Sequence, residues 1–97
     1  METNTSRGNV LVVDDDPGIR SLIKDKLSRD RFTCTNCSNG AEALDALDRQ
    51  AFDIIISDLQ MPGISGLELL RLTHERHNRA AFLMITGVDD IRVVSMP

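Results

Sequence analysis

Four short runs of apolar residues recur along the chain at intervals of about 20 to 30 residues. They cover residues 10–13, 32–35, 54–56 and 82–85. Three of them are continuous rather than alternating, which is typical of strands buried on both faces of a parallel sheet, and the run at 32–35 is the weaker one. The pattern therefore predicts four parallel strands.

Helical spacing of apolar residues fills the segments between these runs. The apolar positions of the three predicted helices are Ile19, Leu22, Ile23 and Leu27; Ala43, Leu44 and Leu47; and Leu67, Leu70 and Leu72. Asp16 is the expected N-cap of the first helix, with Pro17 at its first position. The turn at residues 39–40 opens the second helix, and Ser65 with Glu68 forms a capping box for the third.

Strands and helices thus alternate, and residues 89–94 are expected to begin a fourth helix. Such alternation predicts an α/β fold, a doubly wound parallel sheet with helices on both faces. The length of 97 residues and the 41% share of hydrophobic residues indicate one globular domain spanning residues 1–97.

The formal net charge of -4 restricts the kinds of partner that the chain is expected to bind. An acidic chain is not expected to bind nucleic acid directly, because phosphates require a basic face. No stretch approaches the roughly 18 apolar residues of a membrane span. The polar N-terminus lacks the apolar core of an export signal, so the expected location is the cytoplasm.

Acidic residues gather where the predicted strands end. Residues 14–16 are three consecutive aspartates after the first run, Asp58 follows the third, and Thr86 follows the fourth. If the first and third strands are neighbours, Asp14, Asp15 and Asp58 meet in one pocket. Oxygen ligands of this kind suit Mg²⁺, Mn²⁺ or Ca²⁺. A carboxylate there is also a candidate nucleophile on phosphorus.

At this point the chain resembles the receiver (CheY-like) domain of two-component response regulators. The matching segments are residues 10–16, 53–66 and 83–87, and the match runs from about Val10 to Asp90. The resemblance implies a flavodoxin-like strand order 2-1-3-4. It also implies a phospho-acceptor domain of a phosphorelay, a signalling switch that catalyses only its own phosphorylation and dephosphorylation and is not a turnover enzyme.

The resemblance assigns roles to individual positions. Asp58 matches the phospho-acceptor, and Thr86 matches the hydroxyl residue that bonds the phosphoryl group and switches on activation. Asp15 matches the direct ligand of Mg²⁺, for which Mn²⁺ substitutes, and Asp14 matches a ligand acting through water. Gln60 stands where the family supplies a backbone carbonyl to the metal. The implied partner is a sensor histidine kinase or phosphotransfer protein, which would contact Arg20 and Lys24 on the first helix.

The resemblance stops short of the family's fifth strand, its lysine and its fifth helix. The two lysines of the sequence, Lys24 and Lys26, lie in the first predicted helix. We therefore expect a truncated receiver whose fourth strand is an exposed edge. Such an edge favours self-association through that strand or through segment exchange.

Two alternative functions remain open. A truncated receiver would act as a dimerisation or interaction module that no longer switches. A Mg²⁺-dependent phosphatase would use Asp58 as nucleophile, but that chemistry favours an acid at the position of Gln60. Cys34, Cys37, His74 and His77 form a set of two cysteines and two histidines that could suggest zinc. A zinc or redox role is disfavoured, because residues three apart on a strand point to opposite faces.

Overall fold

The computed structural model describes residues 5–76, 79–87 and 90–94, and for residues 86, 87 and 90–94 it describes the backbone alone. The elements are β1 (Gly8–Val13), α1 (Pro17–Arg29), β2 (Phe32–Cys37), α2 (Gly40–Arg49), β3 (Ile54–Asp58), α3 (Gly66–Arg76), β4 (Ala81–Gly87) and β5 (Asp90–Val94). Their spatial order in the sheet is β2-β1-β3-β4-β5. The four predicted parallel strands and their order 2-1-3-4 are confirmed.

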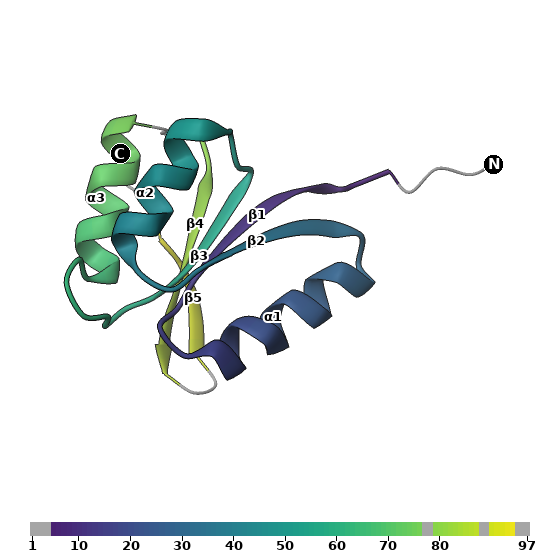
Figure 1. Ribbon diagram of the computed structural model, residues 1–97, viewed down its shortest axis with the longest axis horizontal. Helices are drawn as coiled ribbons and strands as arrows, with labels where there is room; N and C mark the ends of the chain where they lie inside the picture. Colours follow the sequence, from purple (N-terminus) through teal and green to yellow (C-terminus); the bar gives the residue numbers. More distant parts are fainter. Residues whose placement is uncertain (1–4, 77–78, 88–89, 95–97) are drawn as a thin grey trace.

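Alternate residues of the sheet divide the core into two layers. Leu11 and Val13 of β1 pack with α2 and α3 on one face. Val10 and Val12 alternate with them in the sequence and pack with partly buried residues of α1 on the other face. All four are fully buried, which explains the continuous rather than alternating run. Figure 1 shows α2 and α3 together on one side of the sheet and α1 on the other.

Side-chain caps set the beginnings of the helices, largely as predicted. The Asp16 carboxylate accepts hydrogen bonds from the amides of Gly18 and Ile19, at 2.8 and 3.4 Å. Asn39 accepts from the Glu42 amide at 2.9 Å and begins α2. These contacts satisfy amides that have no partner inside their own helix.

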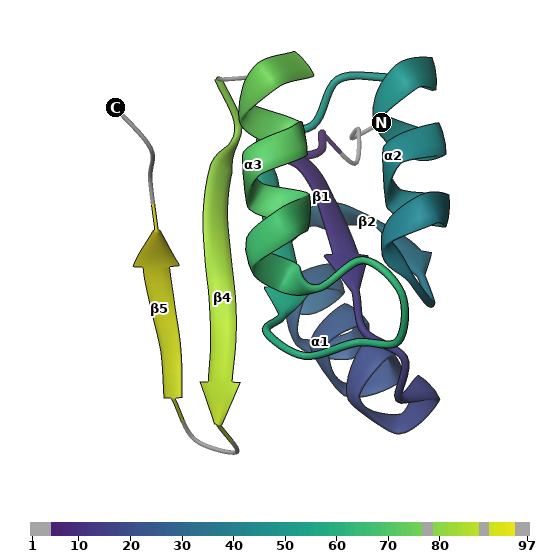
Figure 2. The same ribbon diagram turned by 90° about the vertical axis from the view of Figure 1, so that its left-hand side faces the viewer.

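Residues 90–94 form a strand, so the expectation of a fourth helix is wrong there, and residue 89 lies outside the described residues. β5 pairs antiparallel with β4, as the opposed arrows in Figure 2 show. Ile91, Val93 and Val94 are β-branched, which favours a pleated strand, and a segment of this length is too short for a stable helix of its own. β4 is therefore not the exposed edge, because β5 pairs with it on that side. Self-association, including segment exchange, stays a prediction.

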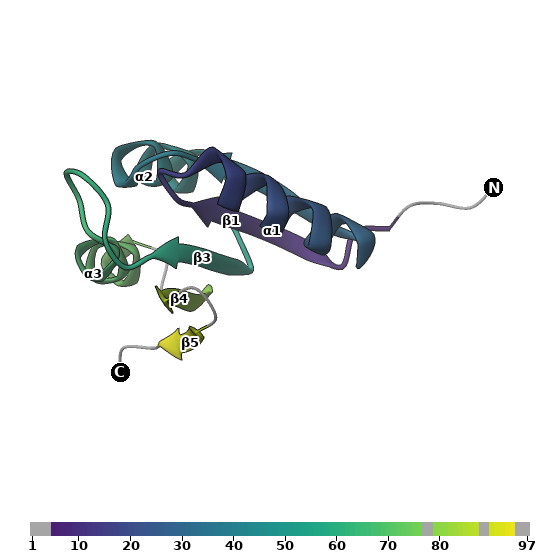
Figure 3. The ribbon, with the colours of Figure 1, turned by 90° about the horizontal axis from the view of Figure 1, so that it is seen from below.

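The register of β4 with β5 contains one irregularity beside the carboxyl end of β4. Ile85 pairs with Ile91, but Gly87 pairs with Asp90, so the backbone of Thr86 is the extra residue of a bulge. Figure 3 shows that β4 and β5 lie at the side of the sheet away from α1. No helix among the described residues is long and apolar enough to cross a membrane.

The buried face of α3 differs from the predicted one. Leu69, Leu70 and Thr73 are buried, whereas Leu67 is 59% exposed and Leu72 is partly buried. Apolar residues occur around most of this helix, so their spacing did not determine which face turns inward.

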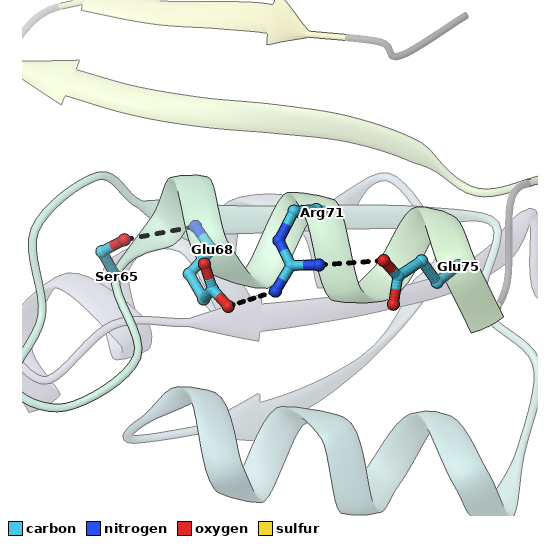
Figure 4. Close-up of polar contacts among 4 residues, drawn as sticks. All are labelled: Ser65, Glu68, Arg71 and Glu75. Atoms are coloured by element: carbon cyan, nitrogen blue, oxygen red, sulfur yellow. Dashed lines mark hydrogen bonds and ion pairs between the residues drawn. The ribbon is translucent and has the colours of Figure 1, made fainter.

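Half of the predicted capping box of α3 is present. The Glu68 amide donates to Ser65 Oγ at 3.2 Å, but the Glu68 carboxylate contacts Arg71, which also reaches Glu75 (Figure 4). These pairs lie one helical turn apart and are exposed, so they stabilise the helix only slightly. Arg71 thus lies on a solvated face of α3.

The buried Thr73 hydroxyl is expected to lower the stability of the fold. Thr73 is 3% exposed, and its Oγ1 has no hydrogen-bond partner among the described residues. Because Val has nearly the same shape without the polar atom, Thr73→Val should raise the free energy of unfolding by about 1 kcal/mol. Urea unfolding followed by circular dichroism measures this change.

Thr33→Val is the matched control for that substitution. The exposed Thr33 hydroxyl donates to Ser6 Oγ at 2.9 Å, so its removal should change stability by less than about 0.5 kcal/mol. A loss of stability in Thr73→Val would contradict the unpartnered state of the buried hydroxyl.

Candidate functional site

Parallel pairing of β1 with β3 brings the predicted acidic residues together. Val13 is in register with Ser57, so Asp14 and Asp58 follow at the same edge of the sheet. One carboxylate oxygen each from Asp14, Asp15 and Asp58 lies within 4.8 Å of the others. The predicted convergence of these three residues is therefore present in the structure.

The carboxyl end of β4 borders the same site. Asp58 is in register with Ile85, and the Leu59 amide donates to the Ile85 carbonyl at 3.2 Å. Thr86 follows Ile85 directly, so its backbone lies at this edge. The side chain of Thr86, for which the family resemblance implies a phosphoryl contact, is not described in the structure.

Asp14 is the buried member of the acidic cluster, with 4% exposure. Desolvation by burial raises the pKa of its carboxyl group, and the hydrogen bond from the Asp16 amide to Oδ1, at 2.9 Å, lowers it. The negative charges of Asp58, Asp15 and Asp16 raise the pKa further. The ionised cluster is thus electrostatically costly unless a positive charge lies nearby.

Asp58 and Asp15 are more accessible. Asp58 is partly buried, and the Gln60 amide lies 3.5 Å from its Oδ1, at the outer limit of a hydrogen bond. Asp15 is exposed, and its carboxylate has no hydrogen bond or ion pair within the described part of the chain. A bound group therefore has access to both carboxylates from solvent.

Gly66 sets the position of α3 against the end of β3. A Cβ atom on Gly66 would lie 2.2 Å from the Asp58 carbonyl oxygen and 2.8 Å from Met84 Sδ. The Gly66 amide also donates to the Leu59 carbonyl at 2.9 Å. Only a residue without a side chain permits this approach, which closes the loop of residues 59–65 beside the site.

Arg20 lies closer to the site than the sequence suggested. It is half-buried rather than fully exposed, and its Nη1 donates to the Asp14 carbonyl at 2.6 Å. Lys24, the other residue expected to face a kinase, is exposed. No local pattern marks a long side chain that reaches back to the backbone, so the sequence did not indicate this contact.

The donor set of the cluster fits a hard divalent cation. The ligand atoms of Asp14, Asp15 and Asp58 are all carboxylate oxygens, which Mg²⁺ and Mn²⁺ prefer. A cation would also offset the repulsion that raises the pKa of Asp14. Gln60 follows two residues after Asp58 and is exposed, and its backbone carbonyl stays a predicted ligand.

The two cysteines point to opposite faces of the sheet, as predicted. Cys37 packs with the core beneath α2 and α3, whereas Cys34 packs with the core beneath α1. Burial raises the pKa of the Cys37 thiol to about 11, so this group is a poor nucleophile. His77, the fourth member of the hypothetical zinc set, lies outside the described residues.

Comparison with known proteins gives a consistent match. Residues 10–96 match the model of the response regulator receiver domain. The DNA-binding transcriptional regulator NtrC of Escherichia coli (strain K12) is 41% identical over 85 residues, which cover 88% of this chain and 18% of NtrC. The response regulator protein PilR of Pseudomonas aeruginosa is 37% identical over 82 residues. The chain thus spans about a fifth of the length of these relatives.

Solved structures give the same result. The chemotaxis response regulator CheY4 of Vibrio cholerae superposes with a TM-score of 0.80 at 30% identity, covering 89% of this chain and 72% of that one. The response regulator protein TrrA of Thermotoga maritima, solved in complex with Mg²⁺-BeF, superposes with a TM-score of 0.78 at 36% identity. That match covers 84% of this chain and 70% of TrrA.

The Gly66 contact predicts a large loss of stability for Gly66→Ala. The added methyl group would overlap the Asp58 carbonyl, so the free energy of unfolding should fall by about 2 kcal/mol despite the higher helix propensity of Ala. Leu67→Ala, at the exposed neighbouring position, should cost less than about 0.5 kcal/mol. Equal stabilities for the two variants in urea unfolding would contradict the close approach.

Asp14→Asn should stabilise the metal-free fold at neutral pH by about 1 kcal/mol, because Asn keeps an acceptor for the Asp16 amide without the charge. Folding raises the pKa of Asp14 above 3.8. The contribution of protonated Asp14 to the free energy of unfolding is therefore fully present below pH 3.8, and it is lost as the pH rises through the pKa of the folded state. Urea unfolding in a chelating buffer should therefore show a gap between variant and original that opens as pH increases. A gap that is constant with pH would contradict this cause.

Proposed function

The chain belongs to the response regulator receiver domain family, and from this premise we propose that Asp58 accepts a phosphoryl group with the help of a divalent cation. The donor would be a phosphohistidine of a sensor kinase or of a phosphotransfer protein. Asp14 and Asp15 would hold Mg²⁺, or Mn²⁺ in its place, together with Asp58 and the Gln60 carbonyl. The domain would serve as a phosphorelay switch in the cytoplasm.

The approach of three carboxylates within 4.8 Å is the observation that carries this proposal. Such a cluster is unfavourable for stability, since each charge makes ionisation of the buried Asp14 harder. A cation-dependent reaction gives the arrangement a function. The similarity to TrrA, whose structure contains Mg²⁺-BeF, supports the choice of Mg²⁺.

The proposed reaction is a direct transfer between two nucleophiles. A carboxylate oxygen of Asp58 attacks phosphorus and forms an O–P bond, while the P–N bond to the donor imidazole breaks. The electron pair of that bond goes to the imidazole nitrogen, which takes up a proton from solvent. A bound divalent cation supplies positive charge that offsets the charge of the transferring group.

The chain's own residues would contribute position and access. Asp58 is held by the β3 backbone and by the Ser57 hydroxyl, which donates to the Asp58 carbonyl at 2.9 Å. Its partial exposure gives a donor access for in-line attack. Attack of water on the acyl phosphate would return the carboxylate and release inorganic phosphate.

Intact-mass measurement tests the proposal. Incubation with Mg²⁺ and acetyl phosphate should add one phosphoryl group, and chelation of the metal should slow its addition by about 100-fold or more. Asp58→Asn should abolish the gain in mass because it removes the nucleophile.

Asp53→Asn is the matched control, since Asp53 lies just before the other end of β3 and its carboxylate contacts only backbone in this region. This variant should be phosphorylated like the original chain. Absence of phosphorylation in the original chain, or its persistence in Asp58→Asn, would refute the proposal. Sustained turnover of a non-activated phosphate ester would favour the phosphatase alternative.

A further inference from the structure

Arg20 contacts the loop that carries two of the three carboxylates. It lies in the first turn of α1, where its amide donates to the Asp16 carbonyl at 3.1 Å. From there the guanidinium reaches back, and Nη1 donates to the Asp14 carbonyl at 2.6 Å. A charged donor at this distance makes one of the stronger hydrogen bonds found in proteins.

This contact completes the bonding of Asp14. The Asp14 amide donates to the Cys37 carbonyl at 3.1 Å, which continues the pairing of β1 with β2. Its Oδ1 accepts from the Asp16 amide at 2.9 Å. With Arg20 on its carbonyl, every polar group of Asp14 except Oδ2 has a partner within the described residues.

The Asp14 carbonyl determines where Asp15 lies. The peptide group is planar, so the orientation of this carbonyl fixes the direction in which the chain leaves toward Asp15. The Asp15 side chain is exposed and makes no contact of its own in the described structure. The position of its carboxylate relative to Asp58 therefore depends on the backbone that Arg20 holds.

The charge of Arg20 is not used in an ion pair within the described chain. The charge of Arg20 helps to lower the pKa of Glu42 in α2, although hydrogen bonds from Ser38 are the main cause of that shift. The guanidinium thus bonds the backbone at the end of β1 and acts on α2 through its charge. Its hydrogen bond to the cluster goes to the Asp14 carbonyl and not to a carboxylate.

We propose that Arg20 is a positioning residue of the cation site, which holds the Asp14–Asp15 peptide so that both carboxylates lie within ligand reach of Asp58. The inference rests on the proposed function, since it assigns an outer-shell partner to the same site. Outer-shell partners of metal ligands typically contribute 10- to 100-fold to affinity, here through the geometry of the ligands.

The sign of one measurement separates position from charge. Removal of a positive charge close to a cation site should strengthen cation binding if charge alone mattered. If Arg20 positions the ligands, Arg20→Gln should instead weaken binding by about 10-fold or more. Arg20→Lys keeps the charge and one donor, so its affinity should lie between those of Arg20→Gln and the original chain.

The experiment is a titration of the full chain with Mn²⁺, in which electron paramagnetic resonance measures free Mn²⁺. It is carried out at a temperature where circular dichroism shows every variant folded. Arg29→Gln is the matched control, because Arg29 is an exposed arginine at the other end of α1. It removes the same charge and should change the affinity by less than about threefold.

The outcomes distinguish failure of the positioning role of Arg20 from failure of the proposed function. Weaker binding in Arg20→Gln, partial recovery in Arg20→Lys and little change in Arg29→Gln would support the positioning role. Unchanged or stronger binding in Arg20→Gln would overturn it and leave the proposed function intact. If Arg20→Gln does not fold, Arg20→Lys decides, since affinity equal to the original would refute a role for the guanidinium geometry. Absence of Asp58-dependent Mn²⁺ binding in the original chain would overturn both proposals.

Discussion

Parallel pairing of β1 with β3 is the constraint on which the site depends. The register of Val13 with Ser57 places Asp14 and Asp58 at one edge of the sheet, although 44 positions separate them in sequence. Buried apolar residues on both faces of β1 hold that register, because a slip by one residue would turn each side chain to the opposite layer. The core therefore supplies the free energy that keeps mutually repelling carboxylates together.

Two close contacts at backbone carbonyls position the helices that follow β3 and β1 against the ends of these strands. Gly66 brings the start of α3 against the Asp58 carbonyl, and Arg20 links the start of α1 to the Asp14 carbonyl. Each contact joins a helix to the backbone of an aspartate of the acidic cluster. Both contacts are made at backbone carbonyls, so neither occupies a carboxylate oxygen of the cluster.

The sequence was sufficient to predict the features that follow from local apolar patterns and from the polar residues at the ends of strands. Continuous apolar runs indicated the parallel strands, and Asp16 was recognised as a cap. The segment 90–94 was expected to be helical because strands and helices alternate before it, whereas pairing with β4 makes it a strand. Leucines around most of α3 could not show that Leu67 is exposed, and nothing local predicts the reach of Arg20 to a carbonyl.

We propose that phosphorylation occurs on Asp58, the aspartate at the end of β3. The most direct test is to phosphorylate the chain with acetyl phosphate and Mg²⁺, reduce the product with borohydride and sequence the peptides by mass spectrometry. Reduction of an acyl phosphate converts the aspartate to homoserine, so homoserine should appear at the position of Asp58. Homoserine at Asp14 or Asp15, or none at any aspartate of a phosphorylated chain, would contradict it.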